Sequence, residues 1–181
     1  MDTLQRPDDM RKAFFYQISR VIVGTLSMGL CGLSAMKIGC LVTARYSQRR
    51  MVTDAFTGNP RPIMSFRTQH GPIVTVLAQI HVLQAFTKKC LDLFTNRTLD
   101  LGIRHCVAAI GKIILLSHCQ EALLSLSERC GAQGLFESNQ LSVMHVSHEM
   151  ALFACTRLEL TVLLGSRISE VQALPKGTFL F

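Results

Sequence analysis

The chain has 181 residues, of which 49% are apolar and only 17% are charged. This composition excludes an intrinsically disordered chain and gives a single domain enough apolar side chains for a sizeable core. The formal net charge is +7 and tryptophan is absent, so a charged partner or ligand is expected to be anionic.

In chain order, the pattern predicts an all-α fold, a helical bundle of about four long helices in one domain covering 1–181. One linker stands out: residues 51–72 contain three of the five prolines together with Gly58 and Gly71. No stretch alternates with period two, so no sheet is expected. Residues 170–181 are predicted to be a tail. Helices are expected at about 10–48, 73–94, 103–129 and 147–169.

The first expected helix raises the question of a membrane span, because residues 21–36 carry no charge and include glycines that could pack helices in lipid. A span needs about twenty apolar residues, and this run is bounded by Arg20 and Lys37. A buried helix of a bundle is therefore preferred, and a membrane-associated helical protein remains the third alternative.

The positive charge is concentrated between residues 37 and 89, where eight Lys or Arg face the single acid Asp54, so that 8 − 1 = +7. Such a field suits a phosphate-bearing ligand, an acidic partner or an anionic surface. Nucleic acid is not expected, because no aromatic residues alternate with the basic ones to stack on bases.

The seven cysteines are widely spaced and no CxxC occurs, which favours reduced thiols in an intracellular compartment. No secretory signal is expected from the polar first nine residues. The final Phe-Leu-Phe at 179–181 is not a peroxisomal signal of the Ser-Lys-Leu type.

Two histidines and a carboxylate, His145, His148 and Glu149, could hold zinc on a helix, but their order matches neither common zinc-protease signature. The pairs at 105–106 and 118–119, each His-Cys, lie about 20 Å apart along one helix and cannot share a metal. They are interpreted as core-facing, and no metal site is predicted.

The segment 127–141 contains Gly131 and Gly134 after a polar helix end. Glycine lets the backbone approach a ligand or another chain closely and adopts positive φ at little cost. A helix C-cap followed by a loop explains the same pattern.

Four segments recur in the order of the first C-terminal helical domain of acyl-CoA oxidases, and over most of its length the chain resembles that family. They are Ala-Arg-Tyr-Ser-Gln-Arg-Arg at 44–50, Arg-Pro-Ile-Met-Ser-Phe-Arg-Thr-Gln-His at 61–70, Arg-Cys-Gly-Ala-Gln-Gly-Leu at 129–135 and Glu-Leu-Thr-Val-Leu at 159–163. The resemblance implies a peroxisomal flavoenzyme of fatty acid β-oxidation. In that family FAD takes a hydride from the β-carbon of a fatty acyl-CoA, a glutamate removes an α-proton, and oxygen reoxidises the flavin with formation of peroxide.

The resemblance places Arg49 at the FAD pyrophosphate, often across a dimer interface. Arg67 stands where the family has a glutamine near the adenine end of FAD. The family's Cys-Gly-Gly-x-Gly loop becomes 130–134, so Gly131 and Gly134 are expected to present backbone N–H groups to phosphate oxygens.

The catalytic position departs from the family pattern. Anchoring the match on 159–162 puts Arg157 at the place of the glutamate base, and arginine is effectively always protonated. Glu159 falls on a second acidic position and would serve as base only in a shifted alignment. Activity of the isolated chain is therefore not expected.

The family's other domains do not fit into 181 residues. One hypothesis is an acyl-CoA oxidase-like chain that keeps partial FAD or acyl-CoA binding, paired with itself or with a complete subunit. The other is a non-catalytic helical module or shortened product that associates through its uncovered apolar surface.

Overall fold

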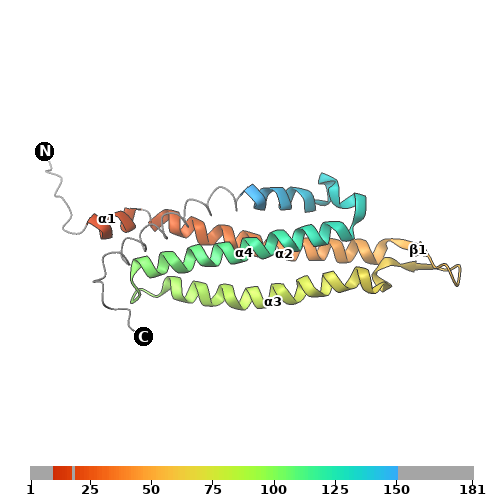
Figure 1. The fold of residues 1–181 in the computed structure, drawn as a ribbon, viewed down its shortest axis with the longest axis horizontal. Coiled ribbons are helices and arrows are strands. Elements are labelled where there is room, and N and C mark those ends of the chain that lie inside the picture. The colour runs from red at the N-terminus through yellow and green to blue at the C-terminus, as the bar shows by residue number, and fades with distance from the viewer. Residues whose placement is uncertain (1–9, 18, 151–181) are drawn as a thin grey trace, which may run out of the picture.

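The computed structural model describes residues 10–17 and 19–150, which form an elongated bundle (Figure 1). Its helices are α1 (Met10–Gln17), α2 (Ser19–Arg49), α3 (Arg67–Thr95) and α4 (Leu101–Arg129). Another helix begins at residue 141 and is described as far as 150. The predicted all-α bundle is confirmed, with one small exception at the linker.

That exception is an antiparallel hairpin of β1 (Met51–Thr53) and β2 (Pro60–Pro62) at one end of the bundle (Figure 1). The expectation of no sheet was wrong here, because strands of three residues are too short to show alternation. Gly58, at φ 69°, allows the tight turn between them. The Asp54 carboxylate fixes the loop by accepting from Phe56 N at 2.9 Å and from Arg61 Nη1 at 2.8 Å.

Two helix starts differ from the predicted ones. α3 begins at Arg67, six residues before the expected start, and includes Pro72; Arg129 Nη1 donates to the carbonyl of Thr68, which the proline leaves without its helical partner. The last helix begins at 141 rather than 147, since Asn139 Oδ1 accepts from Leu141 N at 3.0 Å and so caps it. The rest of that predicted helix, and the tail at 170–181, lie outside the described residues.

α2 and α4 run parallel and pack closely along a line of glycines on α2. A Cβ built on Gly29 would lie 3.0 Å from Leu115 Cδ1, and one built on Gly39 would lie 2.8 Å from Leu123 Cδ2. The residue numbers of the contacting pairs increase together along α2 and α4. The two helices therefore run in the same direction. The glycines therefore serve the contact between α2 and α4, which we call the α2–α4 seam.

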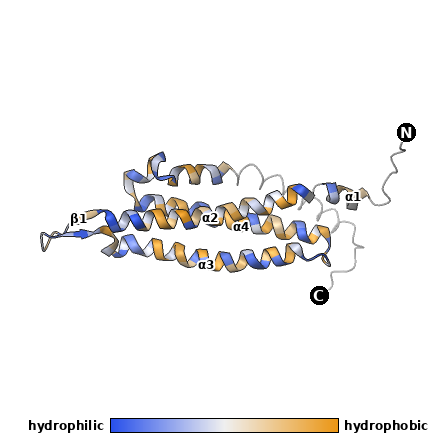
Figure 2. Ribbon diagram, turned by 180° about the vertical axis from the view of Figure 1, so that it is seen from behind, coloured by the Kyte–Doolittle hydropathy of each residue, from blue (hydrophilic) through white to orange (hydrophobic). Residues whose placement is uncertain are grey.

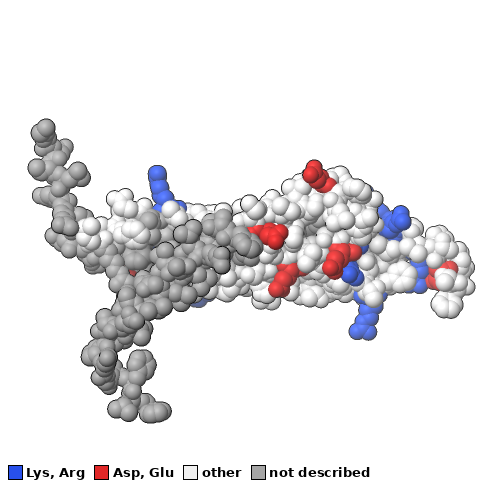
Figure 3. Space-filling view, turned by 45° about the horizontal axis from the view of Figure 1, so that its top comes forward, with Lys and Arg blue, Asp and Glu red and all other residues white. Residues whose placement is uncertain are grey.

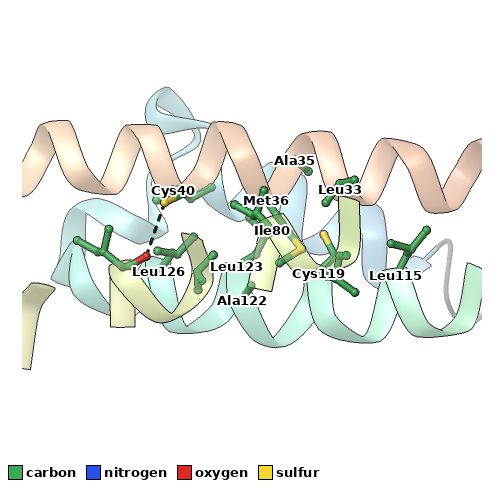
Figure 4. Packing of buried hydrophobic residues seen from close by; sticks show 14 of the residues in the cluster. Leu33, Ala35, Met36, Cys40, Ile80, Leu115, Cys119, Ala122, Leu123 and Leu126 are labelled. Carbon is green, nitrogen blue, oxygen red and sulfur yellow. Dashed lines mark hydrogen bonds between the residues drawn. The ribbon is translucent and has the colours of Figure 1, made fainter. Parts of the chain in front are cut away.

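The core lies where α2, α3 and α4 meet (Figure 4). Met36, Leu115, Cys119, Leu123 and Leu126 are completely buried. Burial raises the pKa of the Cys119 thiol to about 12, so this cysteine stays protonated and packs as a small apolar side chain. The six cysteines of the described part are all free thiols.

α2, α3 and α4 are rich in apolar residues (Figure 2), and several of these side chains are exposed on the outside of the bundle. Leu41 is 59% exposed, Val74 58% and Val82 69%. Two helices, Arg20–Arg49 and Leu101–Arg129, are long and apolar enough to cross a bilayer by length and composition. In each helix about half of the apolar window is buried inside the bundle.

Candidate functional site

Three segments that are distant in sequence meet at the hairpin end of the bundle through the side chain of Gln69. Its Nε2 donates to Ser47 Oγ at 2.8 Å and to the carbonyl oxygen of Arg129 at 2.7 Å. Ser47 belongs to α2, Gln69 to α3 and Arg129 to the last turn of α4. One amide therefore joins the ends of all three long helices.

Pro72 creates a second link at the same place. Because proline has no backbone N–H, the carbonyl of Thr68 four residues earlier loses its usual partner in the helix. Arg129 Nη1 donates to that carbonyl at 3.1 Å and replaces the missing bond. Arg129 thus holds the start of α3 through its side chain and through its own carbonyl.

Beneath this link, a small polar cluster is sealed from water. Thr43 is completely buried, and its hydroxyl donates to the carbonyl of Leu126 at 3.4 Å. Cys130 Sγ lies 3.8 Å from Thr43 Oγ1. Burial raises the pKa of the Cys130 thiol, an effect that the bond with Thr43 partly opposes, so this thiol is not an activated nucleophile.

Three of the four predicted cofactor residues lie two positions from a residue of this link. Arg49 follows Ser47, Arg67 precedes Gln69, and Gly131 follows Arg129. Two residues span at most about 7 Å of chain. The structure therefore brings Arg49, Arg67 and Gly131 to the same end of the bundle.

The two glycines have different structural roles. Gly131 adopts φ 58° directly after the C-cap residue Cys130, and a Cβ there would meet nothing within 4 Å. Gly134 is buried, and a Cβ on it would lie 2.3 Å from the carbonyl oxygen of Ser127. Gly131 thus ends α4, while Gly134 lets the following turn pack on the helix. Their role toward phosphate stays a prediction.

A shallow groove of about 560 Å³ opens on α2 near the hairpin, lined by Arg45, Tyr46, Arg49 and Arg50 with Leu41 and Val42. The three arginines carry positive charge at neutral pH. On the face drawn in Figure 3, several Lys and Arg side chains gather toward the hairpin end, while acidic side chains lie nearer the middle.

The arginines of this groove have the charge and geometry to bind the phosphates of FAD. Arginine presents a planar fork of N–H donors that matches phosphate oxygens, and Arg45, Arg49 and Arg50 line one groove. The adenine end fits less well, because Arg67 is an exposed cation where the resemblance implies an amide. Gln69 is occupied with Ser47 and Arg129 and is not free to replace that amide.

The catalytic candidates Glu159 and Arg157 lie outside the described residues. The histidines can be placed: His148 Nδ1 lies 2.6 Å from the carbonyl oxygen of Met144. Within residues 10–17 and 19–150, no group of three or more His, Cys, Asp or Glu side chains could hold a metal ion. In the first His-Cys pair His105 is buried and Cys106 is half-buried. In the second pair Cys119 is buried and His118 is half-buried.

Sequence reasoning missed Gln69 and Ser47 as the residues that connect the helices. Both lie inside the segments 44–50 and 61–70 that carry the resemblance, but a buried serine on a helix gives no sequence signal of its own. The signal that could have found the contact of Thr68 with Arg129 was Pro72, since a proline inside a helix leaves one carbonyl without its partner.

Comparison with solved structures shows similarity to a known enzyme fold. The fold is similar to a crystal structure of acyl-CoA dehydrogenase from Geobacillus kaustophilus, with a TM-score of 0.68 and 12% sequence identity. The match covers 85% of this chain and 38% of that one, so the chain spans well under half of the solved protein. No protein-family model and no curated protein matches the sequence.

The bundle therefore has an all-α fold similar to part of acyl-CoA dehydrogenase. At this identity the likeness establishes the fold, and the activity of the solved enzyme does not pass to this chain with it.

Proposed function

We propose that this chain is an acyl-CoA oxidase-like helical domain that contributes the phosphate-binding part of a flavin site and does not catalyse oxidation alone. The observation that carries the proposal is the convergence of residues 44–50, 61–70 and 129–135 at one end of the bundle through Gln69. Those same segments carried the resemblance to acyl-CoA oxidases. The acyl-CoA dehydrogenase-like fold supports the same class.

In this proposal Arg49 binds the FAD pyrophosphate, and Arg67 and the backbone at Gly131 and Gly134 lie beside it. FAD supplies the hydride acceptor for acyl-CoA oxidation when it is bound in a complete enzyme of this class. The present chain supplies charge and a fixed backbone, because the Gln69 link holds the three helix ends in one arrangement. The substrate, fatty acyl-CoA, and a peroxisomal location belong to the same proposal.

The 181 residues match only part of such an enzyme. The solved acyl-CoA dehydrogenase is longer, and only 38% of it is matched. We therefore expect the flavin to bind tightly only when a complete homologous subunit, or a second copy of this chain, covers the groove at Arg49.

The test is titration of the purified chain with FAD, ADP and riboflavin, followed by calorimetry and thermal shift. We expect FAD and ADP to bind and riboflavin not to bind, because the proposed contacts are to phosphates. Arg49→Ala should weaken FAD binding about tenfold or more, as expected for loss of a charge-assisted bond worth about 1.5–3 kcal/mol. The matched control is Arg97→Ala, an exposed arginine at the other end of the bundle.

A colourless protein with no FAD-dependent thermal shift, alone or mixed with a complete acyl-CoA oxidase, would overturn this proposal. Peroxide formation from acyl-CoA by the isolated chain would contradict its second half. Arg157→Glu alone is expected not to create that activity, since one added carboxylate supplies neither a flavin nor an acyl-CoA site.

A non-catalytic interaction module is the second candidate, and the exposed apolar side chains of α2 and α3 favour it. It does not require flavin. The membrane-associated alternative rests on the two apolar helices and would be excluded by recovery of the protein in the soluble fraction at high salt without detergent.

A further inference from the structure

A second groove lies between α2 and α3 and adjoins the proposed flavin groove at Leu41, which lines both. Its volume is about 500 Å³, and its walls are almost entirely apolar. Leu41 and Ala44 come from α2, and Val74 and Leu77 from α3. Leu41, Val74 and Leu77 are each about half exposed, so their apolar surface faces water along this groove.

The rim of the groove is basic. Lys37 and His81 line it, and Arg45 lies one helical turn beyond Leu41. Asp54, the one acid between residues 37 and 89, forms an ion pair with Arg61 at 2.8 Å in the hairpin. No carboxylate from this segment therefore offsets the charge beside the groove. An apolar floor with a positive rim is complementary to an apolar stripe with negative flanks.

We propose that the groove between α2 and α3 binds an amphipathic acidic helix of a partner protein. The side chains of two adjacent helices form ridges with a trough between them, into which a third helix can place its apolar side chains. Leu41, Val74 and Leu77 would contact the apolar stripe, and Lys37 and Arg45 would lie beside the acidic flanks.

Charge and shape favour this occupant over two others. A second copy would bring the same segment of net charge +7 against itself, which costs free energy through repulsion. A flat bilayer surface cannot fill a recess between two helices, whereas a helix ridge can. The proposal does not require flavin: the two grooves share Leu41 and Arg45 lines the flavin groove, but Arg49 lines that groove and not the one between α2 and α3.

The probe is a pair of fluorescein-labelled 18-residue helical peptides with the same leucine stripe, one with glutamate flanks and one with lysine flanks. Anisotropy titration with the full chain should show the acidic peptide binding at least about tenfold more tightly, and its affinity should fall as salt rises. Equal binding of both peptides, or binding of neither, would overturn the proposal.

Variants locate the contact. Leu77→Glu places a charge in the floor of the groove and is expected to weaken the acidic peptide about tenfold or more. Val82→Glu is the matched control, because Val82 is exposed on the same helix but does not line the groove. Unchanged binding in Leu77→Glu, with an unchanged circular dichroism melt, would refute the assignment.

Two further measurements separate other occupants. Sedimentation of the chain alone is expected to show a monomer. A dimer that the Leu77→Glu substitution dissociates would overturn the proposal, because the occupant of the groove would then be a second copy of this chain. Vesicles of phosphatidylglycerol and phosphatidylcholine should not compete with the acidic peptide. If they compete with it on the parent chain but do not bind the Leu77→Glu variant, the groove binds a membrane surface and the proposal is overturned. Loss of FAD binding in Arg49→Ala with peptide binding intact would show that the two sites are independent.

Discussion

The two sides of α2 differ in how they use small and apolar residues. Toward α4, glycines let the helices approach until side chains such as Leu115 and Leu123 are completely buried. Toward α3, the contact is made by a few buried residues, including Ile73 and Ile80, and the outer edge stays open as a groove. The α2–α4 seam therefore carries stability, while the side toward α3 leaves apolar surface available for binding.

Truncation of a leucine on each side tests this difference most strongly. Leu123→Ala in the α2–α4 seam is expected to lower the free energy of unfolding by about 2–5 kcal/mol, because it removes fully buried atoms and leaves a cavity. Leu77→Ala in the groove should change it by no more than about 0.5 kcal/mol, since that side chain is about half exposed. Urea unfolding followed by circular dichroism measures both, and similar losses would contradict the comparison.

Glycine substitutions test the closeness of the α2–α4 seam. Gly39→Leu is expected to cost about 1–3 kcal/mol, because its Cβ alone would lie 2.8 Å from Leu123 Cδ2 and 3.3 Å from Leu141 Cδ2. Gly24→Leu is the control on the same helix: a Cβ there meets nothing within 4 Å. This control should be neutral or stabilising by up to about 1 kcal/mol, because glycine disfavours a helix interior. A destabilised control would show that α2 tolerates no added side chain at all.

The link at Gln69 joins both sides of α2 to the hairpin end. Gln69→Glu keeps the shape of the side chain but replaces the donating amide with a carboxylate facing the carbonyl of Arg129. We expect a loss of about 1–3 kcal/mol, the usual cost of leaving buried polar groups unsatisfied. Gln84→Glu makes the same chemical change on an exposed residue of α3 and should alter stability little. Proposed FAD binding should weaken in the first variant and not in the second.

The all-α bundle was predictable because its helices are long and their breaks fall at glycine and proline clusters. The starts of α3 and of the helix at 141 were not, since they depend on single contacts: Arg129 with Thr68 and Asn139 with Leu141. The hairpin was missed because six paired residues leave no periodic pattern.

The candidate site was predictable in composition but not in arrangement. Arg49, Arg67 and Gly131 come from separate segments, and their shared location depends on Gln69, whose partners are remote in sequence. Gly134 was predicted as a ligand residue, and the structure adds a packing reason for it, the carbonyl of Ser127. The sequence alone could not distinguish ligand binding from packing at Gly134, because both need a residue without a Cβ.

The smallest expected effect concerns Asp54, the acid closest in sequence to the basic groove side of α2. The hydrogen bond from Arg61, followed by that from the backbone of Phe56, holds the pKa of the Asp54 carboxyl below its ordinary value of 3.8. A lowered pKa means that the folded hairpin favours the ionised carboxylate. Its stabilising contribution is therefore present above about pH 3.8 and is lost as the pH falls through the lower pKa of the folded state.

Nuclear magnetic resonance of the carboxyl carbon should place the Asp54 midpoint below pH 3.8. The amide signals of Val52 and Arg61 should change with the same midpoint, while those of the α2–α4 seam should not. Asp54→Asn should abolish the midpoint seen at Val52. Because Asp54 itself contacts only the hairpin, and Arg61 keeps its contacts with Ser65 and Phe66, urea unfolding of this variant should match the parent chain closely. A large loss would mean that the hairpin supports the bundle, and that stability does not reside in the α2–α4 seam alone.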